Sequence, residues 1–198
     1  MTKESKKSKL FEMKKNSLIL FLLFVGMAIS CSENPVMPKP KAQLSLNYPE
    51  AKYKKVELDN FSFEQSDRAN LEKVDQKAYN LSYPRMKAKI YITYSDVNRD
   101  LDTLLRDAEK FTFEHTIKAD EIFSNDFVNE SEKIYGTINS ITGNVASQIQ
   151  FHVTDSTKHF ISGSLYFYAQ PNYDSIMPAI KYLKKDVVHI LETLRWIN

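Results

Sequence analysis

Three short segments near the carboxyl end of the chain alternate apolar and polar residues, and they constrain the fold more than any other feature. They cover residues 133–141, 147–155 and 159–169, and each has the length and pattern of a half-buried strand. The connections at 142–144 (TGN) and 155–158 (DSTK) are short and consist of turn-forming residues. Short turns join antiparallel neighbours, so the sequence predicts a three-stranded antiparallel meander.

A long amphipathic helix is predicted after the meander. Asp174 or Ser175 is expected to cap it, and Pro178 is expected in its first turn, where a missing N–H costs little. We expect Trp196 to pack down near its end. Apolar residues recur at helical spacing and should dock across the sheet: Ile176, Ile180, Leu183, Val187, Leu191 and Leu194.

The preceding part of the domain mixes short strands with helical segments. Residues 86–94 give the clearest strand of this part, and residues 101–111 have helical spacing, with Asp96 or Asn98 as the expected cap. Tyr166 and Tyr168 lie on the second face of the last predicted strand, which we expect the amino-terminal segments to cover. The remaining predictions are short strands or loops at 42–49, 53–58, 60–65 and 78–84, a helical piece at 115–123 and a loop at 124–132.

The order of strands, helices, three-stranded meander and helix predicts an α+β fold. Its antiparallel sheet would be flanked by helices, with the carboxy-terminal helix packed on the sheet. We expect residues 43–198 to form a single globular domain, which is an ordinary size for one hydrophobic core.

The beginning of the chain has the organisation of a bacterial signal peptide. Residues 18–29 form an uncharged apolar run that is too short for a membrane span and typical of a signal-peptide core. Lys14 and Lys15 precede it, so "MKKNSLILFLLFVGMAISC" is a compact signal peptide by itself, and Met13 is an alternative start to Met1. We therefore predict that residues 1–30 are a signal peptide.

Cys31 is the single cysteine of the chain, and it follows the sequence "AIS". "AISC" resembles a lipobox, although Ala28 stands where leucine is usual, and the resemblance implies diacylglyceryl attachment and N-acylation at Cys31. The alternative is an ordinary signal peptide that leaves a free thiol, an exposed liability in an exported protein. Residues 31–42 contain three prolines and would form an extended tether of about 3.1 Å per residue.

Net charge excludes one class of function. The chain has 27 basic and 25 acidic side chains, and residues 1–30 hold six of the lysines and two of the glutamates. Without these residues, 21 basic and 23 acidic side chains remain, which gives a net charge of −2. Nucleic-acid binding needs a basic face, so we expect no nucleic-acid partner.

One turn contains residues of hydrolase chemistry. A serine hydrolase would use Ser156 as nucleophile, His159 as base and Asp155 to orient the base. No nucleophile-elbow glycines surround Ser156, and the same residues suit a hairpin turn. We therefore predict a turn and no catalytic residues.

No metal or cofactor is predicted. His115, His152, His159 and His189 lack the spacing of a zinc site within one helix. Phosphate-loop, dinucleotide and calcium-loop patterns are missing as well.

Several stretches together resemble the GldD family, lipoproteins of gliding Bacteroidetes. They are "YPRMKAKIYITY", "EHTIKADEI" and "YGTINSITGNVASQIQFHVTDSTKHFISGSLYFYAQPNYDSIMPAIKYLKKDVVHILETLRW". The similarity covers about Leu44 to Trp196 and implies a role in surface gliding, a process that depends on type IX secretion. It carries over no catalytic residue. At the level of the fold, the predicted architecture is loosely similar to the Mog1/PsbP-like fold, which implies no function.

The first functional hypothesis is a palmitate-bearing, lipid-anchored interaction protein of the gliding and secretion machinery. We expect it in the outer membrane, facing the periplasm, with the inner membrane and the cell surface as alternatives. Its partners would be the membrane and other envelope proteins. The expected contact surface consists of Asn144, Ser147, Asp155, Ser156 and His159.

Two other hypotheses stay open. A periplasmic enzyme acting on peptidoglycan or protein would need Asp155 and His159 to converge with His115 or Asp120. A small-molecule or lipid carrier would use the aromatic face of the sheet as a pocket wall.

Overall fold

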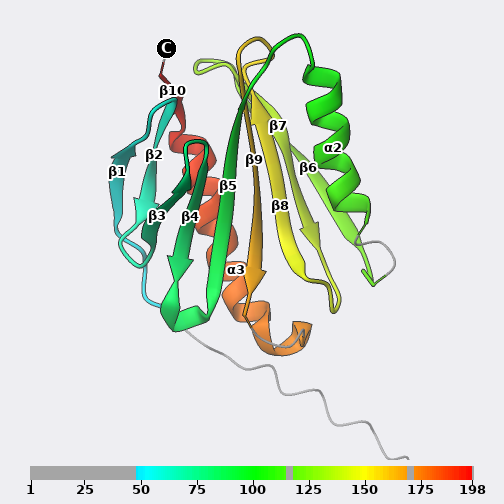
Figure 1. Cartoon of the computed structure of the whole chain (residues 1–198). Coiled ribbons are helices and arrows are strands. Elements are labelled where there is room, and N and C mark those ends of the chain that lie inside the picture. Colours follow the sequence, from blue (N-terminus) through cyan, green and yellow to red (C-terminus); the bar gives the residue numbers. More distant parts are fainter. Residues whose placement is uncertain (1–47, 115–117, 169–171, 198) are drawn as a thin grey trace, which may run out of the picture. The chain divides into compact units, whose positions relative to one another are not determined.

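The computed structural model of the 198-residue chain describes residues 48–114, 118–168 and 172–197 (Figure 1). All of these belong to the compact unit Gln43–Asn198. Among them, no helix combines the length and apolar character that a membrane span requires.

The described chain contains ten strands, two α-helices and one 3₁₀ turn. The α-helices are α2 (Leu101–Phe113) and α3 (Tyr173–Thr193), and η1 covers Pro84–Met86. The strands are β1 (Tyr53–Glu57), β2 (Phe61–Ser66), β3 (Asn70–Asp75), β4 (Ala78–Tyr83), β5 (Ala88–Asp96), β6 (Ile122–Asn129), β7 (Ile134–Ile141), β8 (Ser147–Thr154), β9 (His159–Phe167) and β10 (Arg195–Trp196).

These strands form two antiparallel sheets, so the predicted α+β class is confirmed. The larger sheet has the order β3-β4-β5-β9-β8-β7-β6, and the smaller has the order β1-β2-β10. The predicted meander is the β7-β8-β9 part of the larger sheet, with Val153 opposite Ile161 and Phe151 opposite Gly163. β5 pairs with β9 along its whole length, which places the first clear strand beside the last.

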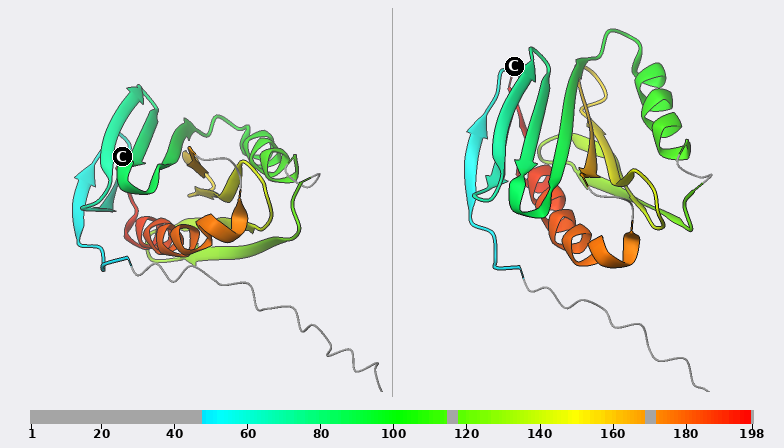
Figure 2. Two further views of the ribbon diagram at one scale, coloured as in Figure 1. Left: turned by 90° about the horizontal axis from the view of Figure 1, so that it is seen from below. Right: turned by 60° about the horizontal axis from the view of Figure 1, so that its bottom comes forward.

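α3 and α2 lie on opposite faces of the large sheet (Figure 2). The α3 face is the main hydrophobic core, and the predicted apolar stripe of α3 is confirmed, because Leu183, Val187 and Leu191 are fully buried. Gly163 shows how tightly this face is packed: a Cβ added there would lie 2.2 Å from Cζ of Phe151. The other large buried side chains of the core include Phe61, Phe63, Tyr79, Leu81, Ile90, Ile92, Ile149 and Leu165.

α2 covers part of the second face, which carries polar side chains at alternate positions. Thr112 of α2 contacts Gln150 of β8 there. Tyr166 lies on this face beside α2 residues, and Tyr168 is 58% exposed. The expectation that amino-terminal segments cover this face is therefore wrong, because β2 packs with α3 instead and Tyr53 of β1 stacks on His189 of α3.

β6 corrects the prediction for residues 115–132. Residues 122–129 are a strand paired with β7 over eight positions, from Ile122 opposite Ile141 to Asn129 opposite Ile134. They form neither the predicted helical end nor the predicted loop. β6 is an edge strand with most side chains exposed, so burial imposes little alternation on its sequence. β3, which was not predicted, is the other edge strand and is equally exposed.

Both helices begin at residues other than those predicted. The N-cap of α2 is Asp100, not Asp96 or Asn98, and the N-cap of α3 is Asn172, not Asp174 or Ser175. Neither capping side chain bonds the helix end. Pro178 consequently lies inside α3, in its second turn.

Candidate functional site

The residues of the predicted anchor lie outside the described part of the chain. This applies to the signal peptide 1–30, to Cys31 and to the tether 31–42. His115 lies outside it as well.

The β8–β9 turn is organised by the Asp155 carboxylate. Its Oδ1 accepts the backbone N–H groups of Thr157, Lys158 and His159 at 2.8–2.9 Å, and its Oδ2 accepts the Thr157 hydroxyl at 2.8 Å. Partial burial would raise the pKa of Asp155, but these donors outweigh it and lower the pKa to about 2. Ser156 follows with a left-handed φ of 66°, so the predicted turn is present.

His159 is a packing residue of the core. Its side chain is 5% exposed, its ring stacks on Trp196 at 5.0 Å, and its Nδ1 lies 2.8 Å from the Tyr94 hydroxyl. Trp196 thus packs down, as predicted. Among the hydrogen bonds of the described residues, none joins the His159 ring to Asp155 or Ser156. The three side chains do not assemble the relay that a serine hydrolase needs.

Asn144 and Ser147 lie at the opposite end of β8 from the Asp155 turn. Asn144 is exposed, and its Oδ1 accepts the backbone N–H of Tyr173 at the start of α3. Ser147 is fully buried and donates to the Ile149 carbonyl. β8 spans eight residues between the two turns, roughly 26 Å at 3.3 Å per residue. The structure therefore does not bring the five predicted surface residues together.

Asp120 lies at the Asn144 end as well. Its backbone N–H donates to the Thr142 carbonyl at 3.0 Å, beside Gly143. Because Asp155 and His159 lie at the far end of β8, the acid–base constellation with Asp120 that the enzyme hypothesis requires does not converge in the structure.

A groove opens between α2 and the second face of the large sheet, where the carrier hypothesis expects an aromatic pocket wall; its polar lining was not predicted. We call it the α2 groove. Its volume is about 440 Å³, within the range of small-molecule sites. Its neutral hydrogen-bonding side chains come from five elements of the structure, α2, β5, β7, β8 and β9: Thr93, Thr112, Asn139, Gln150, His152, Ser162 and Ser164.

Two hydrogen bonds fix the floor of the groove to α2. The Thr112 hydroxyl donates to Oε1 of Gln150 at 2.9 Å and accepts from Nδ2 of Asn139 at 3.2 Å. All three residues are at least nine-tenths buried. This polar contact sets the position of the helix over β7 and β8.

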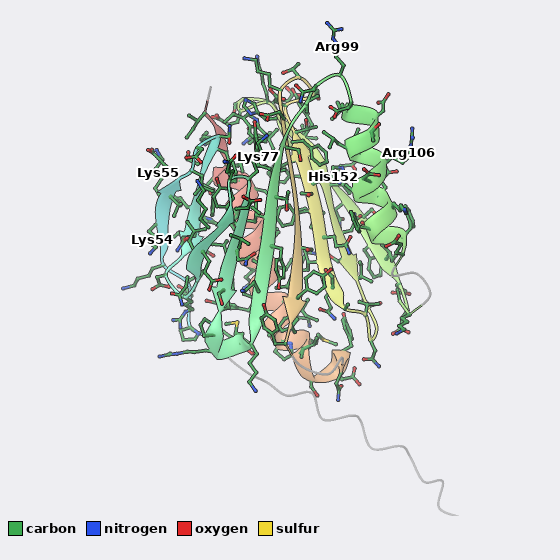
Figure 3. The ribbon with its side chains drawn as sticks, in the orientation of Figure 1. Lys54, Lys55, Lys77, Arg99, Arg106 and His152 are labelled. Carbon is green, nitrogen blue, oxygen red and sulfur yellow. The ribbon has the colours of Figure 1, made fainter. Side chains whose placement is uncertain are left out.

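His152 points from β8 into the space beside α2 (Figure 3). The residue is 7% exposed, and its ring stacks on that of Phe160 with 5.9 Å between the ring centroids. Its ring nitrogens have no hydrogen bond to any described residue. Burial lowers the pKa of His152, while nearby Glu109 opposes this shift more weakly. The ring is thus held neutral, with one N–H donor and one nitrogen acceptor.

Aromatic rings form the other part of the groove. Tyr91 and Tyr166 meet edge to face at 5.4 Å and 88°, and Phe111 of α2 is 66% exposed. The Tyr91 hydroxyl lies 3.0 Å from that of Tyr168. The groove therefore combines ring faces with neutral polar groups.

The α2 groove has few charges. Among the described residues that line it there is no lysine or arginine, and Glu114 is the one acidic residue. Within the described parts of the chain, no group of three His, Cys, Asp or Glu residues is arranged to hold a metal ion. The alternating polar residues of "SQIQFHVT" mark a polar strand face, but the groove itself depends on where α2 lies.

Comparison with known families identifies the family of the chain. Residues 33–196 match the family described as "Gliding motility lipoprotein GldD". A search of curated proteins gives no significant match. The match covers all described secondary structure, from β1 to β10.

Proposed function

Because the chain belongs to the GldD family of gliding motility lipoproteins, we propose that it is an interaction component of the gliding machinery. As a lipoprotein of that family it associates with a membrane through its lipid anchor. The proposal goes further: the protein helps to assemble or stabilise the gliding and type IX secretion apparatus of a Bacteroidetes cell. The family match over residues 33–196 is the observation that carries it.

The proposed anchor is Cys31, acylated after removal of residues 1–30. One acyl chain gives only marginal membrane binding, whereas two or more anchor a protein stably. The proline-containing tether 31–42 would hold the domain away from the surface. We place the protein in the outer membrane, facing the periplasm.

The proposed contact surface lies at the Asp155 end of β8. There the β8–β9 turn meets the loop between β5 and α2, because the Val97 N–H donates to the Lys158 carbonyl at 2.8 Å. A shallow hollow between them is lined by Arg99, Ser156 and Thr157, among others. Arg99 projects from this end (Figure 3), and no ion pair of Arg99 occurs among the described residues.

Paired charge reversals test this surface. Arg99→Glu with Lys158→Glu changes two exposed cations at the proposed surface. In cells carrying the tagged, full-length protein, we expect gently solubilised envelopes to yield partners with the wild type. The double variant should lose these partners at least about tenfold, the effect of about 1.4 kcal/mol, and gliding should fail. Mass spectrometry of the purified complex measures this.

The matched control is Arg106→Glu with Lys54→Glu. These cations are also exposed, lie on α2 and β1 (Figure 3), and give the same change in net charge. The control should glide and retain its partners. Normal gliding and full recovery of partners with the Arg99/Lys158 variant would refute this surface, and recovery of the wild type alone, without partners, would refute the assembly role.

A further inference from the structure

The α2 groove contains hydrogen-bonding capacity that the fold does not use. Ser162, Ser164 and Thr93 line it, and their hydroxyls have no hydrogen bond to any described residue. His152 is more than nine-tenths buried and equally unpaired within that part of the chain. Buried polar groups normally have partners, and the unpaired ring of His152 is the buried group here. Ser162 and Ser164 are half-buried and Thr93 is exposed, so their hydroxyls are free to bind a molecule that also reaches His152.

The absence of lining cations restricts the class of ligand. Phosphate and carboxylate groups are bound in proteins by arginine and lysine. Neither is found among the described lining residues of the groove, whereas Glu114 is. An acyl chain is also a poor fit, because it would cover the His152 ring and the serine hydroxyls without giving them hydrogen-bond partners. The ligand should therefore be uncharged and rich in hydrogen-bonding groups.

The aromatic side chains add a second requirement. Tyr91 and Tyr166 form one wall, and Phe111 lies across from the sheet on α2. Such rings offer apolar faces, and sugar rings present C–H faces between their hydroxyl groups. A ligand with both properties matches the groove's combination of ring faces and neutral donors.

We propose that the α2 groove binds the uncharged sugar rings of a glycan. The inference is independent of the assembly role, because the two sites lie apart. The α2 groove lies on the second face of the large sheet, whereas the proposed contact surface with Arg99 lies at one end of the domain. N-acetylhexosamine and plain hexose chains share this chemistry, so the probes must separate them.

Calorimetric titration of the full-length protein in detergent with chitotriose and with maltotriose tests the proposal. We expect saturable binding of at least one trisaccharide, and the preferred one assigns the sugar class. Tyr91→Ala and His152→Phe should each weaken binding about tenfold or more, as for the loss of one strong contact. His152→Phe removes the ring nitrogens and keeps an aromatic ring.

Tyr135→Ala is the matched control. Tyr135 is 37% exposed, as Tyr91 is at 36%, and it lies on β7 outside the groove. Its binding should equal that of the wild type. Circular dichroism shows whether each variant is folded. If His152→Phe does not fold, Tyr91→Ala alone still tests the proposal.

Three outcomes would overturn the proposal. They are no binding of either trisaccharide by folded wild type, unchanged binding in folded Tyr91→Ala, and displacement of the sugar by a neutral phospholipid added in the same detergent. None of these would affect the partner-recovery experiment with the Arg99/Lys158 variant, so the two proposals can fail separately.

Discussion

Asp155 illustrates how a residue that suggests catalysis can be committed to local structure. Its two carboxylate oxygens accept three backbone N–H groups and one hydroxyl within the same turn. A carboxylate with that many donors is stabilised in its charged form. It is therefore a poor proton acceptor at neutral pH, and its role is to hold the β8–β9 turn.

Removal of this carboxylate should destabilise the protein in a pH-dependent way. Asp155→Ala is expected to lower the free energy of unfolding at pH 7 by about 1–3 kcal/mol, because several donors lose their partner. The pKa is about 2 in the folded protein and about 3.9 when unfolded. The difference in free energy of unfolding between wild type and Asp155→Ala is thus fully present above pH 3.9 and is lost as the pH falls toward 2. Urea unfolding at pH 7 and pH 3 measures the difference.

Asp126→Ala is the control for this measurement. The side chain of Asp126 on β6 is exposed and has no hydrogen bond to any described residue. Its substitution should change stability little at either pH. A cost of Asp155→Ala that stays constant between the two pH values would contradict the role given to the carboxylate.

At the scale of elements, α2 is attached to the sheet differently from α3. α3 buries an apolar stripe in the main core, whereas one residue of α2, Thr112, is buried. Its hydroxyl connects Gln150 and Asn139. The position of α2, and with it the shape of the α2 groove, depends on a small polar contact.

Thr112→Val should release α2 selectively. The substitution keeps the shape of the side chain but leaves the Gln150 and Asn139 amides unpaired, which costs about 1–3 kcal/mol. Hydrogen exchange should show faster opening of α2 amides, while those of α3 stay protected, because weakly packed elements open locally. Thr103→Val, on the exposed side of α2, should leave both helices unchanged. Equal loss of protection in α2 and α3 would show that the helices do not open independently.

At the scale of the whole domain, a buried carboxylate joins the first strand to the last helix. Asp186 of α3 is 1% exposed and accepts the Tyr53 hydroxyl of β1 at 2.9 Å. The Tyr53 ring stacks on His189, one turn further along α3, at 3.6 Å. Burial raises the pKa of Asp186, and the hydrogen bond from Tyr53 together with the nearby hydroxyls of Tyr83 and Ser66 only partly offsets this.

Tyr53→Phe should therefore destabilise the domain more at neutral pH than in acid. Without the hydroxyl, the buried charge of Asp186 loses a donor, at a cost of about 1–3 kcal/mol. The raised pKa means that ionisation of Asp186 works against folding, and this effect vanishes as the pH falls below the folded pKa. The difference from wild type in urea unfolding should shrink between pH 7 and pH 4.

Tyr135→Phe serves as control, since the Tyr135 hydroxyl has no hydrogen bond among the described residues. It should be neutral at both pH values. A Tyr53→Phe penalty that grows in acid would mean that the hydroxyl does not act through the Asp186 charge.

Edge strands and central strands explain which parts of the fold could be predicted. β7, β9 and the stripe of α3 were predictable because one face of each is more buried than the other, and burial imposes a period on the sequence. β8 is buried on both faces rather than half-buried as predicted. Its alternation survives because Ile149, Phe151 and Val153 face the apolar core while Gln150 and His152 face α2. β6 and β3 lie at the sheet edges with most side chains exposed. Their strand conformation comes from backbone pairing with β7 and β4, which leaves no hydrophobic pattern.

The sequence by itself determined the family, the α+β class and the turn role of Asp155, because motifs, periodicity and turn chemistry are local. The tertiary structure alone decided which distant residues meet. It placed Asn144 and Asp155 at opposite ends of β8, buried His159 against Trp196, and opened the α2 groove around His152. The reason is that a groove depends on the distance between a helix and a sheet. The buried carboxylate of Asp186 likewise depends on Tyr53, a hydrogen-bond partner 133 residues away in the sequence. Neither leaves a pattern among neighbouring residues.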